Sequence, residues 1–119
     1  MQIALWVASG LLAFAMMGAG GFKLATPRVK LVERMKWATT WSNRNVKLLG
    51  IAEVLGGIGL IVPEVTGVLP ILTPIAAVCL VVLMIGAVKT HVDLEEPAAP
   101  AAILALLGVF VALGRLGVL

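Results

Sequence analysis

Four long apolar stretches, roughly residues 2–25, 44–62, 68–90 and 100–118, constrain the fold more than any other feature. A helix needs about 20 mostly apolar residues to cross the hydrocarbon core of a bilayer. The chain is 61% hydrophobic and 13% charged, whereas soluble domains average about 25% charged residues. Because lipid offers no hydrogen-bond partner to a bare backbone, each stretch must be helical. The sequence therefore predicts an all-α, polytopic membrane protein, a single domain over residues 1–119 folded as an up-down bundle of four transmembrane helices.

Prolines and glycines mark the expected connections between the spans. Pro63, Gly67 and Pro70 predict a short turn between the second and third spans, and EEPAAP (95–100) predicts a connector into the fourth. The first span begins within MQIALW, which has no basic n-region, and this favours a retained helix over a cleaved signal.

The basic residues predict an orientation. Of the nine Lys and Arg residues, eight flank or fill the first and third connections and one falls on the opposite side. The eight are Lys23, Arg28, Lys30, Arg34, Lys36, Arg44, Lys47 and Lys89, and the ninth is Arg115. By the positive-inside rule, we expect a multi-pass protein of the cytoplasmic (inner) membrane with its basic 26–47 connection cytoplasmic and both termini outside. The net charge of +3 is explained by this topology, so we expect the lipid bilayer as a partner and no nucleic acid.

The first connection, residues 26–43, mixes charged and apolar side chains. Helical spacing groups Leu31, Val32 and Met35, but Arg28 falls on the same arc. Two interpretations stay open: a short interfacial segment anchored by Trp and basic residues on anionic headgroups, or a docking surface for a partner protein.

Glu53 is the one charged residue inside LLGIAEVLGGIGLIVP (48–63). An ionised group near the bilayer centre costs about 2.5–3.5 kcal/mol on insertion scales, so it normally faces other helices and has a partner. Glycines at i−3, i+3 and i+4, namely Gly50, Gly56 and Gly57, would let another helix pack closely beside Glu53.

The expected partners of Glu53 are at the same membrane depth. Lys23 closes the first span and His91 closes the third on the side where Glu53 lies, so the three side chains predict a polar cluster at a cytoplasmic-side pocket. Lys47 and Lys89 are secondary candidates. The alternatives are snorkelling of the lysines to water, a solvated His91, and a purely structural ion pair at Glu53.

Several chemistries are excluded by composition. A single histidine excludes bis-His haem ligation, and a single cysteine, Cys79, excludes an intrachain disulfide and a Cys-rich metal site. GIAEVLGGIGL does not fit a phosphate-binding loop. We therefore expect no metal site, no intrinsic cofactor and no self-contained catalytic or redox centre, and we assign no catalytic residue.

Three segments resemble the DoxX-like family of small four-helix membrane proteins, over nearly the whole chain. They are GAGGFKL (18–24), KLLGIAEVLGGIGLIVP (47–63) and LTPIAAVCLVVLMIGAVKTH (72–91). The pattern K-x-x-G-x-x-E-x-x-G-x-x-G-L-x-x-P is filled by Lys47, Gly50, Glu53, Gly56, Gly59, Leu60 and Pro63. Lys23 matches the family's Gly-x-x-Lys-Leu helix end, and His91 its terminal histidine.

The resemblance implies a link to redox enzymes. The family is named after archaeal subunits associated with a thiosulfate:quinone oxidoreductase, although most members have no assigned reaction. We therefore expect an accessory or ligand-binding subunit that takes a quinone- or lipid-like molecule at Glu53, Lys23 and His91 beside a membrane or peripheral redox protein. The alternative is a small proton-coupled transporter that uses Glu53. Gly108 and Gly114 on the fourth span indicate a homo-oligomer contact face.

Overall fold

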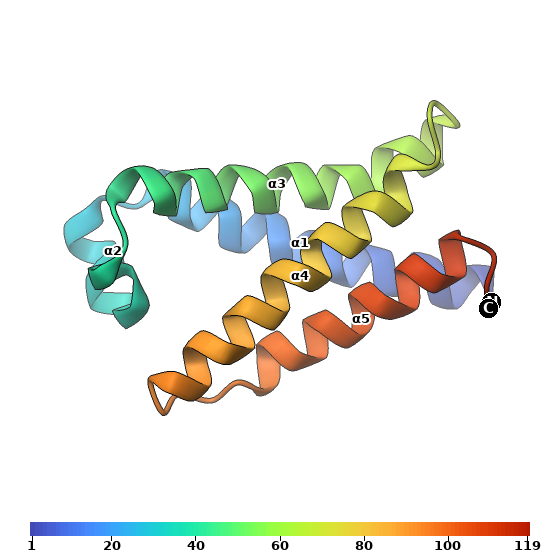
Figure 1. Cartoon of the computed structure of the whole chain (residues 1–119). Helices are drawn as coiled ribbons and strands as arrows, with labels where there is room; N and C mark the ends of the chain where they lie inside the picture. The colour runs from blue at the N-terminus through green and yellow to red at the C-terminus, as the bar shows by residue number, and fades with distance from the viewer.

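The computed structural model describes the backbone of residues 1–119 and every side chain except that of residue 40. The elements in chain order are α1 (Gln2–Ala25), α2 (Arg28–Arg34), a short 3-10 helix η1 (Lys36–Thr40), α3 (Asn43–Thr66), α4 (Leu72–Asp93) and α5 (Ala99–Arg115) (Figure 1). Three helices, α1, α3 and α4, are long and apolar enough to cross a membrane, and α5, with 17 residues, is shorter. The expectation of a helical membrane bundle is confirmed.

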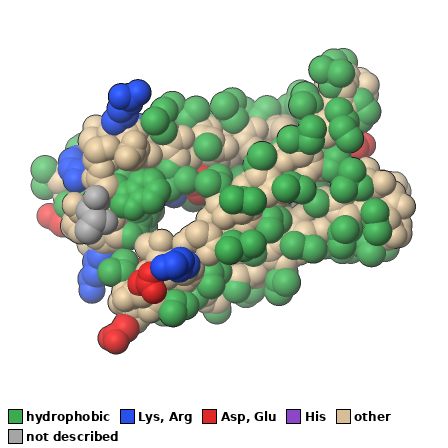
Figure 2. All heavy atoms as spheres, viewed as in Figure 1, with side chains coloured by type: hydrophobic (Ala, Val, Ile, Leu, Met, Phe, Trp, Pro, Cys, Tyr) green, Lys and Arg blue, Asp and Glu red, His purple; other side chains and the backbone are tan. Residues whose placement is uncertain are grey.

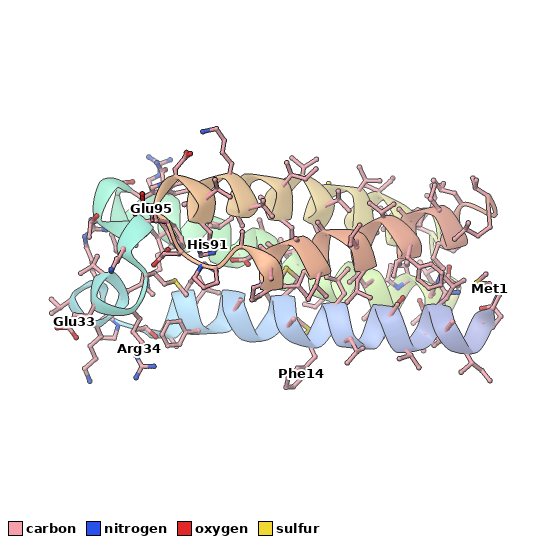
Figure 3. All side chains as sticks on the ribbon, turned by 90° about the horizontal axis from the view of Figure 1, so that it is seen from below. Met1, Phe14, Glu33, Arg34, His91 and Glu95 are labelled. Carbon is pink, nitrogen blue, oxygen red and sulfur yellow. The ribbon has the colours of Figure 1, made fainter. Side chains whose placement is uncertain are left out.

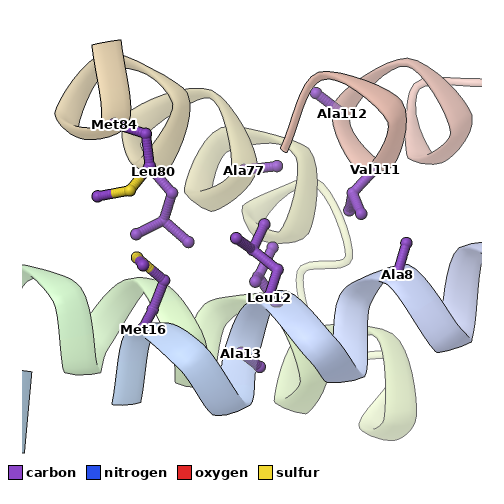
Figure 4. Packing of buried hydrophobic residues seen from close by; sticks show 10 residues of the cluster. Ala8, Leu12, Ala13, Met16, Ala77, Leu80, Met84, Val111 and Ala112 are labelled. Carbon is purple, nitrogen blue, oxygen red and sulfur yellow. The ribbon is translucent and has the colours of Figure 1, made fainter. Parts of the chain in front are cut away.

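The bundle consists of two helical hairpins. Helix α1 packs along α3, and α4 packs along α5, while smaller contacts of α3 with α4 and of α1 with α5 join the hairpins (Figure 1). Between them lies an apolar core that includes Leu12, Met16, Leu80 and Val111 (Figure 4). Large apolar side chains also cover the outside of the helices (Figure 2). Phe14, for example, is 82% exposed and points away from the bundle (Figure 3), as expected of a surface that faces lipid.

Helix α3 differs from its predicted bounds. Pro63 does not end this helix, which continues to Thr66 and stops at Gly67, whose φ of +73° suits glycine. A proline inside a helix leaves the carbonyl four residues earlier without its N–H donor. The Thr73 hydroxyl of α4 donates to that carbonyl, the oxygen of Gly59, at 3.0 Å. This hydrogen bond from another helix explains why the apolar segment tolerates Pro63.

The other helix ends also shift from prediction. Helix α4 begins at Leu72 rather than near residue 68, because residues 67–71 form the turn. Helix α5 ends at Arg115 rather than 118. At the start of α3, the side chain of Ser42 accepts a hydrogen bond from the Asn45 N–H at 3.1 Å, so it caps the helix.

The glycines of α3 lie against two different helices. Gly50 meets α1 at Gly20, and a Cβ added at Gly20 would lie 2.5 Å from the Gly50 carbonyl oxygen. Gly57 also faces α1, whereas a Cβ at Gly56 would lie 2.7 Å from Leu80 of α4. The predicted packing glycines are thus all at helix contacts, but they do not form one face around Glu53.

The two glycines of α5 lie at contacts inside the bundle. A Cβ at Gly108 would lie 2.6 Å from Val81 of α4, and one at Gly114 would clash with Leu5 of α1. Both glycines therefore serve packing inside the bundle, and self-association stays a prediction.

The first connection forms two short helices rather than one amphipathic helix. The chain bends at Met35, which has an extended conformation between α2 and η1. Leu31 and Ala38 are buried together against Val46 of α3. This segment covers one end of the bundle, where Lys and Arg side chains gather (Figure 2). We call this end, formed by α2, η1 and the neighbouring ends of α1, α3 and α4, the α2 end, and the opposite end, with Met1 (Figure 3), the far end.

Candidate functional site

A buried ion pair joins α1 to α3 near the α2 end. The Nζ atom of Lys23 lies 2.6 Å from Oε1 of Glu53, and the two side chains are only 7% and 3% exposed. Each residue follows by three positions the glycine at which the two backbones approach, Gly20 on α1 and Gly50 on α3. Residues three apart share a helix face, so the close glycine contact brings the two charged side chains together.

The geometry of this pair leaves hydrogen-bonding capacity unused. The contact between Lys23 and Glu53 is short enough for an ion pair, but Oε1 of Glu53 has no regular hydrogen-bond partner among the residues that the structure describes. On its other side, the Lys23 ammonium lies 5.9 Å from the centre of the Trp37 ring, within the range of a cation–π contact. Trp37 in turn packs edge-to-face against Trp41, with ring centres 5.3 Å apart.

Lys23 and Glu53 lie on the wall of a cavity of about 580 Å³. Figure 2 shows a hollow between the segment of α2 and η1 and helix α4, where the cavity opens. Most of the lining is apolar and comes from all four long helices together with the α2 and η1 segment; it includes Met16, Ala19, Met35, Leu49, Val82, Leu83, Met84, Ala87, Ala101 and Leu104. Volumes of about 300–1,000 Å³ are typical of small-molecule sites, so the cavity is large enough for a ring system and part of a tail.

His91 lines the same cavity, but its direct partner is a residue that the sequence did not suggest. Its Nδ1 lies 3.2 Å from Oε1 of Glu96, and the side chains of His91 and Glu96 are 31% and 27% exposed. His91 and Arg34 both line this cavity, and Figure 3 shows both towards the α2 end of the molecule. The signal for Glu96 was its position five residues after His91, just before Pro97, where the chain must turn back towards α5.

The secondary lysines do not line the cavity. Lys47 donates hydrogen bonds to the carbonyl oxygens of Lys23, Leu24 and Thr26, with the last at 2.9 Å. It therefore caps the C-terminus of α1, where carbonyls lack helical partners. Lys89 is exposed and pairs with Asp93 at 2.8 Å, one turn along α4.

A second charged contact, not anticipated from the sequence, closes the far end of the bundle. The Arg115 guanidinium lies 4.6 Å from the Trp6 ring centre, and Nη1 lies 3.8 Å from the Glu64 carboxylate. The same nitrogen donates to the Gln2 side chain at 3.1 Å. Arg115 thus joins α5 to both α1 and α3. In the sequence, the only indication of this contact was that Arg115, Glu64 and Gln2 all lie at span ends expected on the same side of the membrane.

Among the residues that the structure describes, no three His, Cys, Asp or Glu side chains are grouped so that they could hold a metal ion. Cys79 is exposed on the outside of α4. The chemistry available at the α2 end is therefore that of an amine, a carboxylate, an imidazole and two indoles around an apolar space.

The apolar helices, the two-hairpin bundle and the buried ion pair define a small helical membrane protein with an internal cavity. A model of the DoxX-like family matches residues 7–114, and the chain belongs to this family. Comparison with curated proteins and with solved structures finds no significant match.

Proposed function

We propose that this DoxX-like protein binds an amphiphilic, quinone-like molecule in the cavity and acts as an accessory membrane subunit beside a redox partner. The observation that carries the proposal is the Lys23–Glu53 pair, which is buried on the wall of a largely apolar cavity. A buried ion pair contributes little net stability compared with apolar packing. Its presence at a cavity, rather than in the packed core, favours a binding role.

The cavity matches the two parts of such a ligand. The methyl- and methylene-rich walls suit an isoprenoid or acyl tail, because burying apolar area stabilises the complex by about 25 cal/mol per Å². At the polar end, the Lys23 ammonium can donate to a carbonyl oxygen of the head group. Trp37 and Trp41 line the same region and offer planar faces for an aromatic ring.

A redox role requires a partner, because the described residues that line the cavity do not include a cysteine pair or a set of metal ligands that could serve as an electron carrier. The surface at the α2 end offers exposed basic residues, including Lys30, Arg34 and Lys36. Such a surface favours an acidic partner protein or anionic headgroups. The proposed division of work is that this chain holds the lipid-soluble molecule while the partner supplies the electron carrier.

The tryptophans provide the test. Trp37 and Trp41 line the cavity, whereas Trp6 stacks on Arg115 at the far end. A short-chain naphthoquinone added to the purified Trp6→Phe variant should quench the remaining fluorescence with a saturable curve. The matched control keeps Trp6 and replaces Trp37 and Trp41 by Phe; quenching there should be weaker and linear with quinone concentration. Equal, non-saturable quenching in both variants would contradict the proposal.

A flux measurement distinguishes ligand binding from the alternative, proton-coupled transport through Glu53. In proteoliposomes with an imposed pH gradient, a transporter would move protons or a cationic substrate and lose this activity in Glu53→Gln. A binding subunit is expected to show no flux above that of empty liposomes.

A further inference from the structure

We infer that the Lys23–Glu53 site prefers a ligand whose aromatic head group carries a hydroxyl, such as a hydroquinone or phenol, over one with only carbonyl or ether oxygens. The inference rests on the proposed binding function and adds the chemical form of the ligand. Its basis is the number of hydrogen-bond donors and acceptors that the two buried side chains offer.

Glu53 has far more acceptor capacity than the protein satisfies. An ionised carboxylate has about four lone-pair positions, and buried carboxylates normally accept several hydrogen bonds. Among the side chains that the structure describes, the polar contact of Glu53 is the ion pair with Lys23, and its buried Oε1 has no hydrogen-bond partner of regular geometry. A donor that enters the cavity would therefore find an acceptor that the helices leave open.

The other cavity carboxylate is already occupied. Glu96 is in contact with His91 Nδ1 at 3.2 Å and is about one-quarter exposed, so it has both a protein partner and access to solvent. Glu53 is almost fully buried. A hydrogen bond to a desolvated charged acceptor is stronger than one to an exposed acceptor. The selectivity is therefore assigned to Glu53 rather than to Glu96.

Lys23 and Glu53 together complement a hydroxyl and only half-complement a carbonyl. A hydroxyl can donate to the Glu53 carboxylate and accept from the Lys23 ammonium, whereas a carbonyl or ether oxygen can only accept. A carbonyl ligand brings no donor to the Glu53 carboxylate, so Lys23 remains its single polar partner among the described side chains and part of its acceptor capacity stays unused, which costs affinity relative to a hydroxyl. Trp37, beside the Lys23 ammonium, favours an aromatic carrier for this hydroxyl.

A matched probe pair tests the preference without redox chemistry, in a protein whose cavity residues are all wild type. We expect 1-naphthol to bind at least about tenfold more tightly than 1-methoxynaphthalene, as a hydrogen bond to a charged group implies. The readout is quenching of Trp37 and Trp41 in the Trp6→Phe background. Equal affinities would overturn the inference but leave the binding function intact, and no saturable binding of either probe would overturn both.

A third probe separates an aromatic source of the hydroxyl from a lipid source. A monoacylglycerol also carries hydroxyls on an apolar tail. We expect it to compete with 1-naphthol only weakly, because it has no ring to place against Trp37. Strong competition by monoacylglycerol, with 1-naphthol itself weak, would overturn the aromatic assignment.

Three variants test whether the preference for a hydroxyl depends on Glu53. Glu53→Gln should lower the naphthol-to-ether ratio several-fold, because a neutral amide oxygen is a weaker acceptor. The double variant Lys23→Met/Glu53→Leu leaves no stranded charge and should bring the ratio to about one. The control Glu96→Gln should keep the wild-type ratio. A ratio that falls in Glu96→Gln and not in Glu53→Gln would overturn the assignment, and the wild-type comparison decides the preference itself if a Glu53 variant does not fold.

Discussion

Each of Lys23 and Glu53 lowers the free-energy cost of burying the other's charge in an apolar environment. Both side chains are almost fully buried, and the interhelical contact of Glu53 is Lys23. Removing one partner of a buried pair strands the other charge, whereas removing both strands neither. The pair therefore has a predictable signature in stability measurements.

We predict that Lys23→Met destabilises the protein by about 3–5 kcal/mol and that Glu53→Gln costs less, since the amide still accepts a hydrogen bond. The Lys23→Met/Glu53→Gln double variant should recover part of the loss. Thermal unfolding in detergent, followed by circular dichroism, gives the double-mutant cycle. Additive effects of the two substitutions would contradict an energetic coupling between the residues.

At the level of the elements, the α3–α4 contact depends on a hydrogen bond that replaces a helical one. Thr73→Val keeps the shape of the side chain but leaves the Gly59 carbonyl without a donor, so we predict a loss of about 1–3 kcal/mol. Thr73→Ser, which keeps the hydroxyl, is the matched control and should lose much less. A Thr73→Val protein with the wild-type melting temperature would show that the carbonyl is satisfied in another way.

The crossing of α1 and α3 depends on Gly20. Gly20→Ala should be strongly destabilising, because its Cβ would lie 2.5 Å from a backbone oxygen of α3, which cannot move cheaply. Gly18→Ala is the matched control on the same helix, as no atom lies within 4 Å of its Cβ position. Both substitutions gain the same helix propensity, up to about 1 kcal/mol, so melting temperatures should separate the two sites. Similar shifts in both variants would contradict a tight crossing.

These elements also show what sequence reasoning reaches and where it stops. Apolar length predicted the long helices, and spacing placed a small-residue contact beside Glu53, because both depend on local periodicity. The continuation of α3 through Pro63 could not be predicted, since its compensating donor, Thr73, belongs to another helix. The contact of His91 with Glu96 likewise depends on how the chain turns between α4 and α5.

For the whole molecule, the distribution of basic residues gives a testable orientation. In a Cys79→Ala background, Lys36→Cys and Val68→Cys place thiols on exposed positions of η1 and of the α3–α4 turn. We predict that membrane-impermeant maleimide labels position 68 in intact cells and position 36 only after lysis. Labelling in the reverse pattern would invert the proposed topology, and labelling of both in intact cells would contradict a complete crossing between them.

The shortness of α5 has a consequence for the bilayer itself. Its 17 residues extend about 25 Å, against a hydrocarbon thickness of about 30 Å. Because Arg115 is tied to Gln2 at one end, the shortfall lies at the other, where Pro100 and Ala101 line the cavity. We expect lipids beside this end to compress their chains to match the shorter helix, which is a local hydrophobic mismatch. Such local thinning of the bilayer would bring the headgroup layer to the rim of the cavity. We therefore expect the cost of the mismatch to rise in membranes with longer acyl chains.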